Sequence, residues 1–156
     1  GHYPVVNSPA LPKPHAVAPP IVIGGGGPKR TPALAAKYAA EFNTPFVTRE
    51  FFTKQCGRVR AACEAIDRDP DDLAYSAALI VCCGADEAEV ERRAASLGRE
   101  PSELRENGLA GTPAEVAERI RSWRDAGADR IYLQVMDLAD LDHLDLIAGD
   151  VVAELA

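Results

Sequence analysis

The chain has 156 residues, of which 47% are hydrophobic and 26% charged, a composition typical of one soluble globular domain with a buried core. Its net charge of -7 argues against a basic surface for nucleic acid or anionic membrane, so any bound anion must be held by local geometry. The longest apolar run, residues 77–83, is too short to span a bilayer, and we expect a cytoplasmic protein without nucleic-acid or membrane partners.

The first twenty residues differ from the rest of the chain. They contain half of the twelve prolines, and proline is excluded from helix interiors and central strands. This predicts an extended, proline-rich arm over residues 1–20 and a folded domain over residues 21–156.

Short apolar runs, each followed by an amphipathic stretch, then predict alternating strands and helices. The first strand covers residues 21–23, and Thr31 with Pro32 predicts a helix that begins with a threonine cap and a proline at its first position. A strand over 42–47 and a helix over 48–67 follow. The buried stripe of that helix is expected to comprise Phe51, Phe52, Val59, Ala62 and Ile66.

The pattern continues with a strand over 75–83, a helix over 86–97 and a helical turn over 101–106. Thr112 and Glu115 form a capping box, which predicts a helix that ends at Gly127 and buries Trp123. The last strand is expected over 130–135.

A closing helix is expected over 138–155, capped by Asp137 or Asp140. Its acidic residues favour helix capping and a solvated face over a metal site, and His143 is expected to be exposed. The arginines of the predicted helices also fit solvated faces; they are Arg92, Arg93, Arg119, Arg121 and Arg124.

The four cysteines and three histidines show no metal-ligand spacing, which predicts reduced thiols and no metal site. Cys82 and Cys83 are neighbours in an apolar run and should point to opposite faces of a strand.

Four consecutive strand–helix units predict an α/β fold with a parallel sheet and right-handed crossovers. A complete eight-unit barrel needs about 250 residues, so this chain is expected to hold half of one. Because the outer strands of such a half would be bare, we expect an N-terminal half-barrel or a second copy to complete the sheet.

A glycine-rich loop joins the first strand to the first helix. Glycine amides can turn toward an anion, the start of a helix adds partial positive charge, and basic and hydroxyl side chains follow. The predicted phosphate site consists of Gly24, Gly25, Gly26, Gly27, Lys29, Arg30 and Thr31. The alternative is a tight turn whose glycines only permit close packing. The spacing does not fit a Walker loop or the dinucleotide fingerprint.

Three stretches carry a family resemblance: residues 19–43 (PPIVIGGGGPKRTPALAAKYAAEFN), 68–98 (RDPDDLAYSAALIVCCGADEAEVERRAASLG) and 108–137 (GLAGTPAEVAERIRSWRDAGADRIYLQVMD). In this order they resemble the second half of the bacterial luciferase-like family, flavin- or coenzyme F420-dependent oxidoreductases with a TIM-barrel fold. The resemblance implies that the glycine loop holds the phosphate of FMN or coenzyme F420. One departure is Ala40, where members commonly have aspartate; Glu41 follows it.

The resemblance implies a luciferase-like oxidoreductase or monooxygenase that binds a reduced flavin or deazaflavin through its phosphate and transfers hydride to or from a small organic substrate. The alternative is a non-catalytic half-barrel that binds a phosphorylated ligand or a partner chain. The family's first four strands have no counterpart here, so the catalytic residues stay unassigned. Candidates at strand ends, where barrels place their chemistry, are Asn43, Thr44, Gln134 and Met136; each is expected to be a pocket wall or a loop residue before a catalyst.

Overall fold

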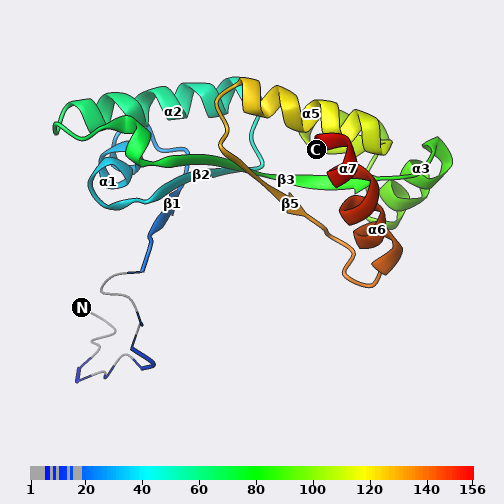
Figure 1. Ribbon diagram of the computed structural model, residues 1–156, viewed down its shortest axis with the longest axis horizontal. Helices are drawn as coiled ribbons and strands as arrows, with labels where there is room; N and C mark the ends of the chain where they lie inside the picture. The colour runs from blue at the N-terminus through cyan, green and yellow to red at the C-terminus, as the bar shows by residue number, and fades with distance from the viewer. Residues whose placement is uncertain (1–5, 8, 10, 14, 16–18) are drawn as a thin grey trace.

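The computed structural model describes residues 6–7, 9, 11–13, 15 and 19–156 (Figure 1). Much of the predicted arm, including Pro4 and Pro14, lies outside these residues. The arm and its boundary with the domain therefore stay predictions.

Each strand of the described chain is followed by one or more helices. The strands are β1 (Val22–Gly24), β2 (Glu41–Pro45), β3 (Ala74–Cys83), β4 (Leu109–Gly111) and β5 (Arg130–Gln134). The helices are α1 (Arg30–Tyr38), α2 (Arg49–Glu64), α3 (Glu87–Ser96), α4 (Pro101–Asn107), α5 (Pro113–Asp125), α6 (Leu141–Leu146) and α7 (Val152–Leu155), with a 3-10 turn at Pro70–Asp72 and a π-helical turn at Ile147–Val151. The predicted strands are present within one to two residues of their expected bounds; β4 is additional.

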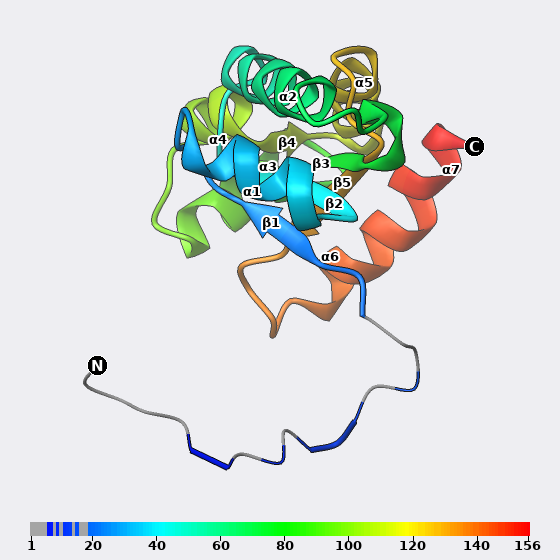
Figure 2. The ribbon, with the colours of Figure 1, turned by 90° about the vertical axis from the view of Figure 1, so that its left-hand side faces the viewer.

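All strand pairs are parallel, and the ten-residue strand β3 is the centre of the sheet. Its residues 74–78 pair with β2, residues 76–80 with β5 and residues 81–83 with β4, while β1 pairs with β2. Figures 1 and 2 show this succession of parallel strands with connecting helices. The predicted α/β class is confirmed.

Helices α2 and α5 lie along one face of the sheet (Figure 1). Phe52 of α2 and Trp123 of α5 meet edge to face with ring centroids 5.5 Å apart, and both belong to the main core. The prediction that Trp123 is buried is confirmed. The prediction for Ile66 is wrong: it is 52% exposed, because α2 ends at Glu64 and the chain turns there.

The opposite face of the sheet has no described helix across its middle (Figures 1 and 2). Val22 of β1 and Tyr132 of β5 are exposed on the sheet as a result. Since a hydrophobic sheet face is normally buried against another layer, this is the face that further polypeptide would cover.

Strand β4 was not predicted because three residues are too few to show an apolar alternation. It fits against the end of β3 with the help of glycine: a Cβ at Gly108 would lie 2.8 Å from the carbonyl oxygen of Ile80. The capping box that follows β4 is confirmed, since the Thr112 N–H donates to Glu115 Oε2 at 2.8 Å.

The closing helix is shorter than predicted. It begins at Leu141, where Asp140 is the N-cap and accepts the His143 N–H at 3.0 Å, and a π-helical turn separates α6 from α7. Asp140 is thus confirmed as the cap, whereas a single helix over 138–155 is wrong. No helix in the described part of the chain has both the length and the apolar character needed to cross a bilayer.

Candidate cofactor site

The glycine loop occupies residues 25–29, between β1 and α1. Gly24, the last residue of β1, lies beside Asn43 of β2, so the loop leaves the sheet at the carboxyl ends of its parallel strands. In α/β folds this is the edge at which ligands bind. Because β1 is an outer strand, the loop lies at the side of the sheet that has no further described neighbour.

The loop amides are available to a ligand. No hydrogen bond joins the N–H of Gly25, Gly26, Gly27 or Lys29 to another residue in the described ranges. Gly25 has a φ of 130°, a conformation that side-chain-bearing residues rarely adopt. An exposed or half-exposed run of unpaired amides before a helix is the arrangement that an anion requires.

Thr31 lies against the same loop. Its Oγ1 would be 3.4 Å from a Cβ at Gly25 and 3.0 Å from a Cβ at Gly27, so side chains at these glycines would fill the space around the hydroxyl. The prediction that Thr31 caps α1 is wrong: the helix begins at Arg30, and the N-cap Lys29 makes no side-chain cap hydrogen bond. Thr31 lies one residue inside the helix, and its hydroxyl lies next to the glycines of the loop. Lys29 and Arg30 are exposed.

The other predicted candidates are dispersed. Asn43 is half-buried and donates to Ser76 Oγ at 2.9 Å, whereas Thr44 is 1% exposed and its Oγ1 is the buried side-chain atom without a partner in the described structure. Gln134 and Met136 are exposed at the end of β5, three strand positions from β1, or about 14 Å at the usual strand spacing. The structure therefore brings only Asn43 and Thr44 near the loop.

Glu41 is a buried residue at the amino end of β2. Its Oε1 accepts hydrogen bonds from Ser76 Oγ at 2.6 Å and from the Tyr132 hydroxyl at 2.8 Å, and Oε2 pairs with Arg130. The carboxylate thus ties β2, β3 and β5 together on the open face. This role is structural, because Glu41 lies at the edge opposite to the strand ends that hold ligands.

A cleft of about 660 Å³ opens elsewhere, between the start of α2 and the segment from α4 to α5. It contains no residue of the glycine loop, and its walls carry both arginines and glutamates. Arg105 is already paired with Glu87, and Glu115 belongs to the capping box. The mixed charge gives this cleft no preference for an anion.

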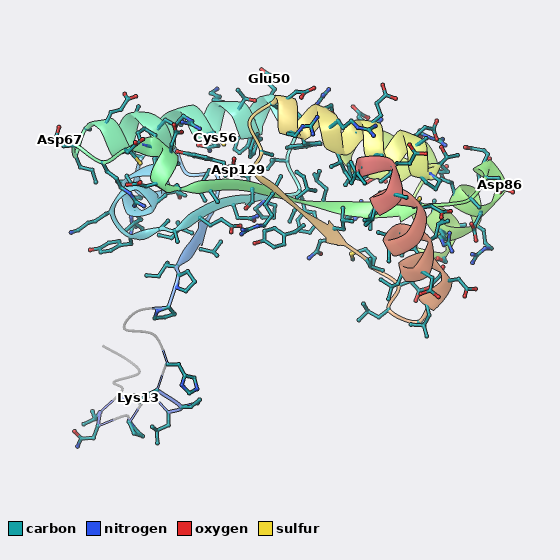
Figure 3. The ribbon with its side chains drawn as sticks, viewed as in Figure 1. Lys13, Glu50, Cys56, Asp67, Asp86 and Asp129 are labelled. Atoms are coloured by element: carbon teal, nitrogen blue, oxygen red, sulfur yellow. The ribbon has the colours of Figure 1, made fainter. Side chains whose placement is uncertain are left out.

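The cysteines of the described chain are all free and buried. Burial raises the pKa of the Cys56 thiol to about 12 and that of Cys83 to about 11. Figure 3 shows Cys56 on the side of α2 that faces the sheet. Because a thiolate is the reactive form, these residues are not nucleophiles at neutral pH. No cluster of histidine, cysteine and carboxylate side chains suited to a metal occurs among the described residues.

A second polar cluster lies where α3 and α6 meet the end of β3. Arg93 is 3% exposed, and its Nη1 donates to the Cys83 carbonyl at 2.7 Å while its Nε donates to Asp140 Oδ2 at 2.8 Å. His143 is 5% exposed and its Nε2 accepts the Cys83 N–H at 3.0 Å. The predictions that Arg93 and His143 are solvated are therefore wrong, because both side chains satisfy backbone groups at the end of a buried strand.

This cluster makes stability depend on pH. Burial, reinforced by Arg93 and Arg92, lowers the pKa of His143 below 6.5 despite Asp140 and Glu89. Below about pH 6.5 the unfolded chain therefore binds the proton more readily than the folded protein, so acidification favours unfolding, and this contribution is absent at higher pH. Urea unfolding at pH 7.5 and 5.5 should show a larger loss of stability in the wild type than in His143→Gln.

Glutamine can accept the Cys83 N–H without titrating, so the variant retains the contact and removes the proton linkage. Carboxylates contribute equally to both proteins. Identical pH dependence in the two would show that His143 is not the proton-linked group.

Comparison with known proteins identifies the family. The model of the family described as luciferase-like monooxygenase matches residues 1–104, two of the three stretches that carry the resemblance. The chain belongs to this family. No curated protein sequence matches it.

Several solved structures have a similar fold. The coenzyme F420-dependent tetrahydromethanopterin reductase from Methanopyrus kandleri has a TM-score of 0.71 at 13% identity, over 88% of this chain and 51% of its own. EDTA monooxygenase from Chelativorans sp. BNC1 has a TM-score of 0.72 at 21% identity, over 99% and 50%. The oxygenating constituent of 3,6-diketocamphane monooxygenase from Pseudomonas putida, in complex with FMN, has a TM-score of 0.64 at 18% identity, over 89% and 50%.

The luciferase-like chain thus spans about half the length of the solved structures it matches. At these identities the likeness is one of fold. It confirms the expectation that the β/α units form half of a luciferase-like barrel.

Proposed function

We propose that this chain is the cofactor-phosphate-binding half of a flavin- or coenzyme F420-dependent oxidoreductase. The observation that carries the proposal is the glycine loop, whose amides have no described partner and lie at the carboxyl ends of the strands. The similar structures include a coenzyme F420-dependent reductase and a monooxygenase in complex with FMN, which support a phosphorylated flavin or deazaflavin as the ligand.

The loop fits a phosphate group. Gly25 and Gly27 both lie next to the Thr31 hydroxyl, and a Cβ at either glycine would occupy the space beside it. Arg30 lies at the first turn of α1, where a positive side chain adds to the partial charge of the helix start. A phosphate monoester is the ligand chemistry that these donors recognise together.

A bound flavin or deazaflavin would supply the hydride chemistry for a small organic substrate. The residues of this chain would hold the phosphate end, leaving the ring to a pocket completed by other strands. Asn43, held by Ser76, is the polar side chain closest in register to the loop.

We also propose that other polypeptide completes the barrel, either an N-terminal half-barrel or a second copy. β1 and β5 each pair with one described strand, and the face between them is open. A cytoplasmic location suits the four free thiols, which reducing compartments preserve.

The test compares FMN with riboflavin, which lacks the phosphate. Fluorescence titration of the purified protein should give a dissociation constant for FMN that is at least about tenfold lower than that for riboflavin. The reason is that each hydrogen bond to a charged group contributes roughly 1.5–3 kcal/mol. Coenzyme F420 titrated in parallel distinguishes the two cofactor classes. Equal affinity for FMN and riboflavin, with no binding of coenzyme F420, would refute the phosphate site. Binding without turnover of any substrate would favour the non-catalytic half-barrel.

A further inference from the structure

One buried polar side chain of α2 is not explained by packing. Gln55 is 0% exposed, and the other buried positions of the helix are Phe52, Cys56, Val59 and Cys63. Burying an amide costs free energy unless it is hydrogen-bonded, and ordering a long side chain costs more. An apolar residue of similar size would pack here without that cost. Packing alone therefore does not explain a glutamine at this position, and the partners of its amide have to be considered.

The amide of Gln55 contacts the glycine loop. Its Nε2 donates to the carbonyl oxygen of Gly26 at 2.5 Å, while its Oε1 accepts from Arg58 Nη1 at 3.2 Å. Phe51, one helical turn earlier, places its ring 3.0 Å from the position of a Cβ on Gly26. Two side chains of α2 therefore contact the same glycine.

The hydrogen bond fixes the orientation of one peptide group. In a trans peptide the carbonyl oxygen and the following N–H point in opposite directions. Because the Gly26 oxygen is held toward Gln55, the N–H of Gly27 points away from α2. That N–H has no partner among the residues described, and Gly27 lies next to the Thr31 hydroxyl.

We propose that Gln55 is a positioning residue for the anion-binding loop: its hydrogen bond to Gly26 holds the Gly27 N–H toward the bound phosphate. A run of four glycines gives the peptide many accessible orientations, and each would otherwise have to be restricted when the ligand binds. The inference rests on the proposed function, since it assumes that the loop binds phosphate.

The experiment measures FMN and riboflavin affinities of Gln55→Met, which keeps the length of the side chain and removes the donor. FMN affinity should fall about three- to tenfold while riboflavin affinity stays unchanged, the size expected for one lost hydrogen bond. Arg58→Met is the matched control: it removes the other partner of Gln55 and should leave both affinities unchanged. Equal losses for FMN and riboflavin in Gln55→Met would overturn the positioning role in favour of a general packing role.

A measurement on the wild type needs no variant to fold. In ¹⁵N-labelled protein, inorganic phosphate should shift the amide resonance of Gly27. If that resonance does not shift although FMN binds more tightly than riboflavin, the role of Gln55 is refuted while the proposed function stands. If the wild type does not distinguish FMN from riboflavin and does not bind coenzyme F420, the proposed function fails and the inference fails with it.

Discussion

Replacing Gly25 with valine should remove FMN binding, with a loss of affinity of at least about 100-fold. Gly25 has a φ of 130°, and a Cβ there would lie 3.4 Å from Thr31 Oγ1. Valine would force the backbone out of this conformation, at a cost of roughly 1–3 kcal/mol, or fill the space that the phosphate needs. In either case at least two amide contacts to a charged group are lost, each contributing about 1.5–3 kcal/mol.

Gly127→Val is the matched control for backbone strain. Gly127 has a φ of 96°, nothing lies within 4 Å of its Cβ position, and it follows α5, away from the loop. The Gly127→Val variant should have a lower melting temperature than the wild type and an unchanged affinity for FMN. Isothermal titration of both variants and the wild type separates the effects; unchanged FMN affinity in Gly25→Val would show that the glycines form only a tight turn.

Replacing Arg93 with methionine should destabilise the protein by about 3–5 kcal/mol, the usual effect of removing one partner from a buried ion pair. The guanidinium is enclosed, and it pairs with Asp140 and Glu89 and donates to the Cys83 carbonyl. Methionine fills the volume but leaves the Cys83 carbonyl without its side-chain donor and Asp140 without its shortest ion pair. Denaturant unfolding monitored by circular dichroism measures the loss.

The neighbouring residue offers a control. Arg92 has a side chain that is 59% exposed and pairs with Glu89 at 3.3 Å. Arg92→Met should cost less than about 1 kcal/mol, as exposed pairs do. A similar, small effect of both variants would show that the Arg93 cluster does not hold α3 and α6 against β3.

The elements that sequence patterns predict well are those with a local signal. The capping box at Thr112, the buried Trp123 and the glycine loop each depend on residues within a few positions of one another. Strand β4 and the π-helical turn at Ile147–Val151 have no such signal, because pairing with β3 and docking of the last helix determine them.

The buried polar residues that sequence patterns place in solvent also have partners that are distant in the sequence. Arg93 and His143 sit among charged neighbours in the sequence, which suggests solvent, yet their partners are the backbone of Cys83 and the side chain of Asp140, 10 to 60 positions away. Gln55 bonds to Gly26 at a separation of 29. A stripe of buried apolar residues interrupted by one glutamine is the only sequence sign of that contact, and it does not name the partner.

Strand β3 is the one strand of the described sheet that pairs with three others. Strands β2, β4 and β5 each pair with it, so its strand pairs join residues that are up to 54 positions apart. Loss of β1 would release a single edge, whereas local opening in the middle of β3 would disconnect the strand pair β1–β2 from β5 at once. The sheet is therefore complete only once residues 130–134 have paired with β3, a contact between segments far apart in the sequence whose closure costs chain entropy.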